Sequence, residues 1–314
     1  MVLAIFLIII GFALLIVGAD LLVDGSSNVA KRFHIPEIII GLTIVSIGTS
    51  MPELFVSTTS SLDGFSDMAL GNIIGSNLCN FLLILGISTI IKPVKFKKET
   101  MFIEIPMCLA ITVIFILLCN TGGKITRLEA IILLILFIGF IGYTIFMAKR
   151  ESKTAGEEKG KIPKGNIFKD ILFIILGVIG LKIGGDLAVN NAVKVANFFN
   201  VSEKIISLTI LAIGTSLPEL VTSVTAAIKG NSDIAIGNII GSNIFNMLFI
   251  IGVASVIQPI TYNFSYNLDL SILLIATIVL ALFPIIPPKN KMSRANGIIY
   301  FFMYLGYMGI LFIN

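Results

Sequence analysis

The chain has 314 residues, of which 56% are hydrophobic and 13% are charged. A soluble domain carries about twice that charged fraction, so the composition excludes an ordinary soluble protein and indicates a membrane protein. The formal net charge of +4 does not suggest nucleic-acid binding.

Apolar segments of about 18 residues or more follow one another along the whole chain, and each is long enough to cross a bilayer. The first begins at Met1 without a basic region or a following cleavage site, so we interpret it as a membrane helix and not a signal peptide. The sequence predicts an all-α polytopic membrane protein with ten transmembrane helices, at 2–30, 36–62, 67–91, 101–119, 126–148, 167–197, 202–228, 233–257, 267–286 and 294–313.

The two halves of the chain repeat. A shift of 166 residues aligns Glu53 with Glu219 and Asn80 with Asn246, and thirty of fifty positions are identical between 37–86 and 203–252. The predicted domains are a first five-helix repeat at 1–148, a charged linker at 149–166 and a second repeat at 167–314. Because each half holds an odd number of helices, the second enters the membrane from the opposite side, which is an inverted-topology repeat.

The distribution of basic residues predicts the orientation. The loops on the linker side carry seventeen Lys and Arg residues, and those on the other side carry about four. The positive-inside rule therefore places 149–166 in the cytoplasm and both termini outside. We expect an integral protein of a prokaryotic cell membrane, with the lipid bilayer as its surroundings and no protein partner indicated.

One motif occurs once in each half, as Gly-Thr-Ser-Met-Pro-Glu at 48–53 and Gly-Thr-Ser-Leu-Pro-Glu at 214–219. Each copy places a carboxylate inside an apolar segment, where an ionisable residue is costly and indicates function. The proline before each glutamate lacks an N–H, so Pro52 leaves the carbonyl of Gly48 without its helical partner. Such a carbonyl persists at membrane depth only if protein, water or a ligand satisfies it.

A second motif, Gly-Asn-Ile-Ile-Gly-Ser-Asn, occurs at 71–77 and 237–243. Together the motifs offer two carboxylates with hydroxyl, amide and carbonyl oxygens, which suit a hard cation such as Ca²⁺. Zinc or copper would favour His or Cys, which the motifs lack. Two negative charges match one Ca²⁺, or two or more monovalent ions or protons, so mutually exclusive occupancy would allow exchange.

These paired segments resemble the α-repeats of the sodium/calcium exchangers, within the Ca²⁺:cation antiporter superfamily. The resemblance spans essentially the whole chain and implies Na⁺/Ca²⁺ antiport by alternating access, with the first and sixth helices sliding across the core. It implies no cofactor beyond the transported Ca²⁺ and Na⁺. The long calcium-sensing loop of animal exchangers is missing, which is typical of prokaryotic members.

By position, the resemblance makes Glu53 and Glu219 the principal ion ligands. The resemblance also implies further ion ligands of three kinds. They are the carbonyl oxygens of Thr49, Thr215, Ser46 and Ala212, the hydroxyl oxygens of Ser50, Ser76, Ser216 and Ser242, and the central amide side chains of Asn80 and Asn246. Several family members, notably potassium-dependent ones, carry aspartate where this chain has Asn80 or Asn246. With asparagine at both positions, we predict sodium-driven exchange that needs no potassium.

Other classes fit less well. A channel needs no pair of interrupted helices, a membrane enzyme would need a nucleophile with a base, and no phosphate-binding motif supports an ATP-driven pump. We therefore predict that the protein is not an enzyme. A proton/calcium exchanger that uses the same carboxylates remains the alternative.

Several polar and sulfur-bearing residues have simpler interpretations. The three cysteines, Cys79, Cys108 and Cys119, are predicted to be buried apolar residues, and His34 a solvated residue at a helix edge. Lys182 is expected to pair with Asp186 one turn away. Asp67 and Asp233 are expected to cap the helices that follow Ser66 and Ser232.

Overall fold

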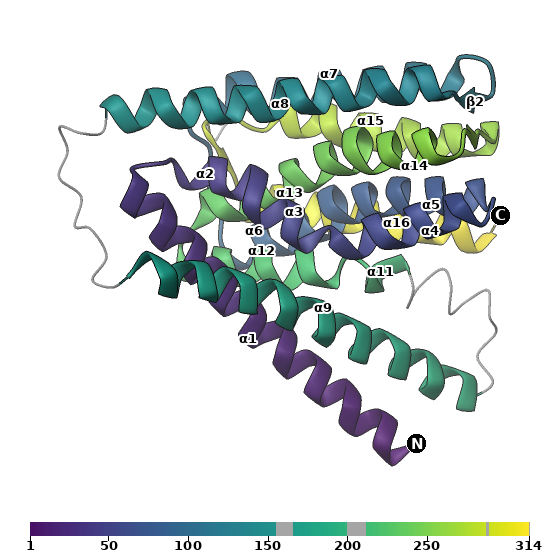
Figure 1. Ribbon diagram of the computed structural model, residues 1–314, viewed down its shortest axis with the longest axis horizontal. Helices are drawn as coiled ribbons and strands as arrows, with labels where there is room; N and C mark the ends of the chain where they lie inside the picture. Colours follow the sequence, from purple (N-terminus) through teal and green to yellow (C-terminus); the bar gives the residue numbers. More distant parts are fainter. Residues whose placement is uncertain (155–165, 200–211, 287–288, 314) are drawn as a thin grey trace.

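The computed structural model describes residues 1–154, 166–199, 212–286 and 289–313, and nearly all of them are helical (Figure 1). The first half comprises α1 (Val2–Phe33), α2 (Glu37–Ile40), η1 (Gly41–Val45), α3 (Ser46–Thr49), α4 (Met51–Leu62), α5 (Ser66–Leu78), η2 (Cys79–Ile84), α6 (Leu85–Ile91), β1 (Val94–Lys95), η3 (Thr100–Glu104), α7 (Ile105–Asn120), β2 (Lys124–Ile125) and α8 (Arg127–Thr154).

The second half repeats this order. It comprises α9 (Ile167–Phe198), α11 (Ala212–Gly214), α12 (Leu217–Lys229), α13 (Ser232–Phe245), η6 (Asn246–Ile250), α14 (Ile251–Ile257), β3 (Ile260–Thr261), η7 (Phe264–Tyr266), α15 (Asn267–Leu282), β4 (Lys291–Met292) and α16 (Arg294–Ile313). The predicted span 202–228 is described only from Ala212 onward, because 202–211 lie outside the described residues.

Seven helices of the described chain are long and apolar enough to cross a membrane, and the bent pair Glu37–Thr49 with Met51–Leu62 makes eight. The predicted spans 202–228 and 294–313 are not among these eight, although α12 and α16 are helical there. The structure is thus that of a helical membrane protein. The α8 helix continues to Thr154, so the predicted linker begins as helix, and 155–165 lie outside the described residues.

The most deeply buried spans are α5–η2–α6 and α13–η6–α14, which lie inside the bundle. Their sequences combine small residues with isoleucine and leucine, so other helices can approach closely on every side. Two short strand pairs also link the two halves: β1 pairs antiparallel with β4, and β2 pairs antiparallel with β3. Each half therefore completes a two-stranded sheet begun by the other.

The α1 and α9 helices form a pair that crosses the rest of the bundle obliquely (Figure 1). A Cβ atom built on Gly18 would lie 2.9 Å from the carbonyl oxygen of Gly177, and one on Gly11 would lie 2.8 Å from that of Gly184. Only glycine allows backbones to approach this closely. The seven-residue spacing of these glycines in both helices is a signal that the sequence analysis missed.

The two chain ends lie at one end of the bundle, and α8 ends and α9 begins at the other (Figure 1). We call the first end the terminal face and the second the linker face. These two names carry no assumption about which face is cytoplasmic.

Several minor predictions can now be checked. The cysteines are buried and free, and Lys182 Nζ lies 3.1 Å from Asp186 Oδ2, so both predictions are confirmed. The His34 residue is half-buried and forms the left-handed C-cap of α1, at φ 54°. The prediction that Asp67 and Asp233 cap their helices needs correction.

The α5 and α13 helices have Phe65 and Asn231 at their N-caps, and neither side chain caps its helix. The residues Asp67 and Asp233 lie inside the first turn, so the prediction that they cap these helices is wrong. A carboxylate in this position interacts favourably with the helix dipole without capping. Asp233 also forms an ion pair with Lys97 at 2.6 Å.

Candidate functional site: a buried pair of carboxylates

The repeated proline motif breaks a helix in both halves. The α3 helix ends at Thr49 and α4 begins at Met51, and the two parts of this span are bent by 50°. The break follows from Pro52, which cannot donate to the carbonyl four residues earlier but is well tolerated in the first turn of α4. In the second half α11 ends at Gly214, and Pro218 lies in the first turn of α12.

The glutamates that follow the two prolines are both buried, each with 1% of its surface exposed. Each accepts a hydrogen bond from the serine of the opposite motif: Ser50 Oγ donates to Glu219 Oε1 at 2.7 Å, and Ser216 Oγ donates to Glu53 Oε1 at 3.3 Å. Ser76 lies 3.4 Å from the same Glu53 oxygen. The two motifs, far apart in the sequence, thus form one site.

Several acceptor oxygens around these glutamates have no hydrogen-bond partner among the residues that the structure describes. They are Oε2 of Glu53, Oε2 of Glu219, and Oδ1 of Asn80, Asn243 and Asn246. A buried oxygen without a donor is costly, because desolvation is not compensated. A bound cation would satisfy several such oxygens at once, and this donor set contains no nitrogen or sulfur. It therefore suits a hard cation.

The central amides lie where the helices are locally widened. The π-helical segment η2 contains Asn80, and Asn246 opens the π-helical segment η6. Such segments often occur at functional sites. Asn246 Nδ2 donates to Asn77 Oδ1 at 3.0 Å, which links the two inner spans across the halves.

The remaining predicted ligands lie around this centre and differ in their hydrogen-bond partners. Ser242 Oγ is 3.0 Å from Ser50 Oγ, which extends the serine–glutamate network. The carbonyl of Ser46 accepts the amide of Ser50 at 3.0 Å, and its hydroxyl donates to the Leu42 carbonyl, so a cation would use the second lone pair of the Ser46 carbonyl oxygen. Ala212 is the first residue of α11, and its ligand role remains a prediction.

Two asparagines of the second motif were not among the predicted ligands, yet each forms a hydrogen bond with a predicted ligand. Thr49 Oγ1 lies 3.0 Å from Asn238 Oδ1, and Thr215 Oγ1 lies 3.4 Å from Asn72 Oδ1. Their occurrence in both copies of Gly-Asn-Ile-Ile-Gly-Ser-Asn was the signal that could have identified them.

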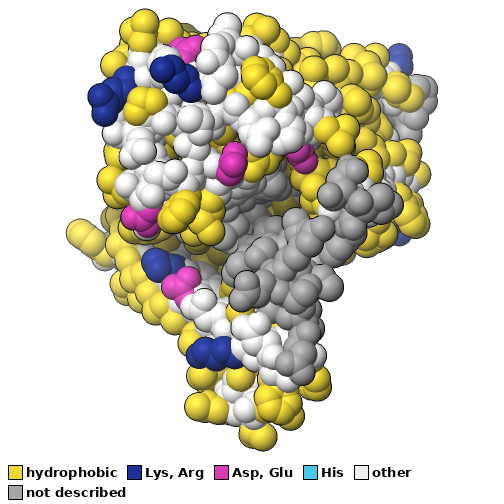
Figure 2. Space-filling model, turned by 90° about the vertical axis from the view of Figure 1, so that its right-hand side faces the viewer, with side chains coloured by type: hydrophobic (Ala, Val, Ile, Leu, Met, Phe, Trp, Pro, Cys, Tyr) yellow, Lys and Arg dark blue, Asp and Glu magenta, His cyan; other side chains and the backbone are white. Residues whose placement is uncertain are grey.

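A cavity of about 550 Å³ leads from the terminal face toward the site. Its lining includes Asp67 and Asp269 together with three residues of the site region, Asn72, Ser76 and Thr215. Viewed from this face, the molecule has a hollow with acidic side chains at its rim (Figure 2). The buried carboxylates are thus approached by a partly polar route from one end of the bundle.

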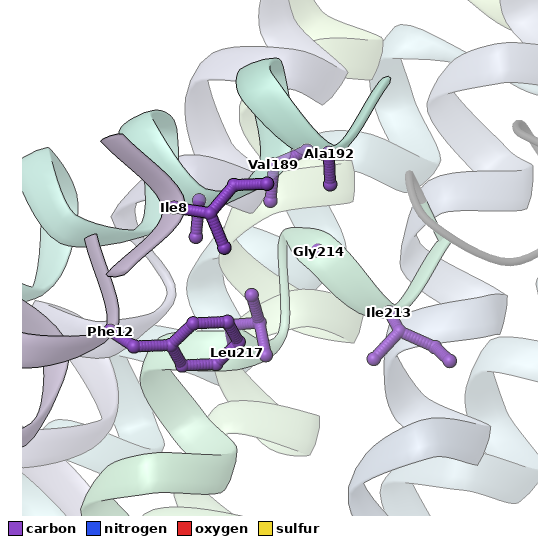
Figure 3. Close-up of a pocket in the computed structure, with 8 residues that line it drawn as sticks. Ile8, Phe12, Val189, Ala192, Ile213, Gly214 and Leu217 are labelled. Atoms are coloured by element: carbon purple, nitrogen blue, oxygen red, sulfur yellow. The ribbon is translucent and has the colours of Figure 1, made fainter. Parts of the chain in front are cut away.

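A second cavity, of about 240 Å³, separates the α1/α9 pair from the break in the second half. Its lining is apolar: Ile8, Phe12, Ala188, Val189, Ala192, Ile213, Gly214 and Leu217. Phe12 of α1 lies beside Leu217 of α12 (Figure 3). The described residues that line this cavity are all apolar, and it marks incomplete packing between α1 and the broken span.

The glycine that opens each proline motif lets α9 approach the breaks. A Cβ atom on Gly48 would lie 2.8 Å from Val178 Cγ2, and one on Gly214 would lie 2.6 Å from Val189 Cγ2. A side chain at either position would therefore clash with a valine side chain of α9. The glycines thus allow the α1/α9 pair to lie directly over the site.

In the part of the chain that the structure describes, no group of three or more His, Cys, Asp or Glu residues could hold a metal ion. The site is therefore a pair of carboxylates surrounded by neutral oxygens. Such a pair offers two formal charges to a cation within an otherwise neutral set of oxygens.

Comparison with known proteins identifies the class of protein. A profile of the family described as "Sodium/calcium exchanger protein" matches residues 3–146 and 169–313, and the chain belongs to this family. It is 35% identical to the "Putative antiporter CaxA" of Alkalimonas amylolytica, over 99% of both chains. It is 27% identical to the "Sodium/calcium exchanger MaX1" of Methanosarcina acetivorans, over 98% of this chain and 97% of that one.

A solved structure of the sodium-calcium exchanger NCX_Mj, soaked with Na⁺ and Ca²⁺, superimposes with a TM-score of 0.85. The two sequences are 30% identical, and the match covers 98% of each chain. The protein is therefore a cation/Ca²⁺ antiporter of the prokaryotic type, and a transporter instead of an enzyme.

Proposed function

We propose that the protein exchanges Na⁺ for Ca²⁺ across the membrane and binds the ions between Glu53 and Glu219. The observation that carries this proposal is the pair of buried, unpartnered Oε2 atoms beside unpartnered amide oxygens. One Ca²⁺ would neutralise both carboxylates. Several Na⁺ could replace it if the hydroxyl and amide oxygens share their coordination. Binding of one kind of ion then excludes the other, which couples the two fluxes.

Among the described residues, the site borders a cavity on the terminal face. Asn72 and Thr215 line the terminal-face cavity, whereas the matching residues Asn238 and Thr49 are fully buried, at 0% exposed. Alternating access would require the second set to open when the first closes. We propose that the α1/α9 pair moves across the broken spans to bring this about, in agreement with rigid-body models of repeat transporters.

The proposed topology is ten transmembrane helices in two inverted repeats of five, at 1–148 and 167–314, joined by 149–166. The reciprocal strand pairs and the reciprocal serine–glutamate bonds support it. A further reciprocal pair supports it as well: Arg127 donates to the carbonyl of Val256, and Arg294 donates to that of Ile90.

The proposed orientation places the linker face in the cytoplasm and both termini outside, on the basis of the basic residues. A single cysteine in place of Glu158, in a background without the three native cysteines, tests it. We expect labelling by a membrane-impermeant thiol reagent only after the cells are opened. Labelling in intact cells would reverse the orientation.

Proton/calcium exchange is the second candidate. No Lys or Arg forms an ion pair with either glutamate among the described residues. A buried carboxylate without a counter-ion can be neutralised by a proton as well as by a metal cation. Protons could therefore take the place of Na⁺ at the same oxygens.

Calcium uptake into proteoliposomes distinguishes these candidates. We expect uptake when the vesicles are loaded with Na⁺, with K⁺ absent on both sides and the proton gradient collapsed. Uptake that requires a pH gradient and ignores Na⁺ would favour the proton exchanger. Uptake that vanishes without K⁺ would contradict potassium independence.

A further inference from the structure

Asn72 and Asn238 each connect three elements around the site. Thr49 at the end of α3 donates to Asn238 on α13, and Thr215 after α11 donates to Asn72 on α5. In both cases the threonine and the asparagine belong to different halves of the chain.

The amide nitrogens of the same asparagines bind their own half. Asn238 Nδ2 donates to Ser223 Oγ on α12 at 2.9 Å, and Asn72 Nδ2 donates to Ser57 Oγ on α4 at 3.0 Å. Asn72 Nδ2 also lies 3.4 Å from the backbone oxygen of Glu53. Each asparagine thus joins the part of a broken span that precedes the break in one half to the part that follows the break in the other.

We propose that Asn72 and Asn238 are positioning residues of the ion site. They hold the threonine that precedes each glutamate-binding serine, and so set where Ser50 and Ser216 place their hydroxyls against the two carboxylates. This rests on the proposed exchange function, because the effect would be read in ion affinity. Neither asparagine needs to touch an ion.

A double-mutant cycle between Thr49→Val and Asn238→Ala tests this role in calcium uptake by vesicles. We expect each single change to raise the KM for Ca²⁺ by about tenfold, with kcat altered by no more than about twofold. The double variant should resemble Asn238→Ala alone, because the Thr49–Asn238 bond is already absent from that single variant. Thr277→Val is the matched control, since Thr277 is a buried threonine that bonds only within α15, and its KM should not change.

Additive effects in the double variant, or a loss confined to kcat, would refute the positioning role. If Asn238→Ala does not fold, Thr49→Val alone still tests the bond, because valine keeps the shape of threonine. Absence of calcium uptake by the unmodified protein in the same assay would instead contradict the proposed function.

A separate observation concerns the linker face, where Lys229 at the end of α12 contacts α1. Lys229 Nζ lies 2.5 Å from Asp20 Oδ1 and 2.6 Å from Asp24 Oδ1. It also donates to the backbone oxygen of Asp20 at 3.2 Å. These contacts join the α1/α9 pair to the bundle that holds the ion site.

The repeat does not reproduce this lysine. A shift of 166 residues relates Lys229 to Asp63 at the end of α4, and Asp20 and Asp24 to Asp186 and Asn190 on α9. The two helix ends correspond in structure as well, because each is followed by a glycine with positive φ, Gly64 at 80° and Gly230 at 87°. The counterpart contact would bring Asp63 toward Asp186, whose charge Lys182 already balances at 3.1 Å, whereas Lys229 meets two carboxylates.

The geometry points to an electrostatic latch that favours one of the two conformations. In the conformation open to the terminal face, Lys229 holds α1 against α12. When the two repeats exchange conformations, as alternating access requires, α9 would bring the Lys182–Asp186 pair toward Asp63, and this pair has no net charge to hold it there. The ion-free protein therefore favours the state that is open to the terminal face. This rests on the proposed alternating access but not on which ion is carried.

Thiol labelling reads this equilibrium without any transport assay. A single cysteine in place of Met68, which lines the terminal-face cavity, reports how open that cavity is in ion-free proteoliposomes. We expect Lys229→Gln to slow its labelling by roughly fivefold, the effect of losing a part-exposed cluster of charges. Asp63→Lys, which adds an attractive contact to Asp186 on the opposite face, should slow it in the same direction.

Lys97→Gln is the matched control, because it removes an ion pair of 2.6 Å on the linker face that does not involve α1 or α9. Its labelling rate should equal that of the Met68→Cys protein in which both lysines are intact. Equal rates in Lys229→Gln and Lys97→Gln would overturn the latch. If Lys229→Gln does not fold, Asp63→Lys retains the native lysine and tests the same asymmetry.

Discussion

The two halves of the ion site share a sequence but lie in different surroundings. On the terminal face the Thr215–Asn72 bond is 3.4 Å long and borders a cavity. On the other side the Thr49–Asn238 bond is 3.0 Å long and fully buried. Since the residues are the same, the difference arises from how the α1/α9 pair and the bundle are arranged. The difference shows that the motif supplies the same polar groups to both halves, and that the tertiary arrangement decides which half borders the cavity.

The largest effect is expected when the glutamate of either half is neutralised, one at a time. We expect Glu53→Gln and Glu219→Gln to reduce calcium uptake to below about a hundredth, because a divalent ion would then face a single carboxylate in a buried site. Detergent-solubilised protein should remain monodisperse. Near-normal uptake in either variant would contradict binding by both halves together.

Cysteines at matching positions sharpen the difference in access. Met68 is 58% exposed and lines the cavity, whereas Ile234, its counterpart in the second half, is fully buried. Met68→Cys should react readily with a water-soluble maleimide in the ion-free protein, and Ile234→Cys should react far more slowly. Equal rates would mean that the two halves are equally open in solution.

A negative charge added at the centre of the site, from either half, should alter its ion selectivity. Asn246→Asp or Asn80→Asp would place a third carboxylate near Glu53 and Glu219, which strengthens the attraction for cations in a site of low dielectric. We expect the apparent affinity for Ca²⁺ to rise about tenfold, and uptake to become sensitive to K⁺. Competition between Ca²⁺ and K⁺ in isotope-binding measurements checks this. An unchanged affinity would place these asparagines outside the site.

The smallest expected effect concerns the α1/α9 pair, which both halves share. Gly18→Ala would place a Cβ atom 2.8 Å from the backbone of Leu181, and such overpacking costs about 1–3 kcal/mol of stability. Gly139→Ala is the matched control, because nothing lies within 4 Å of its Cβ position. Thermal unfolding in detergent should show a lower Tm for the first variant only. Equal Tm values would argue against close backbone packing in the pair.

Much of the architecture follows from local sequence patterns. Apolar segments of membrane-spanning length predicted the helices, and Pro52 predicted the break before Glu53 because a proline cannot donate the helical hydrogen bond. The pairing of Lys182 with Asp186 was predictable because residues four apart share a helix face. The doubled motif identified the candidate ligands because carboxylates are costly at membrane depth.

Other features depend on contacts that the sequence pattern does not reveal. That Ser50 binds Glu219, and Ser216 binds Glu53, depends on how the halves interlock. The capping prediction for Asp67 failed because α5 begins at Ser66, which places Asp67 inside its first turn. The sequence alone determined which groups are available to bind a cation. Only the tertiary structure decided which of them meet and from which face they are reached, because packing between distant segments sets those distances.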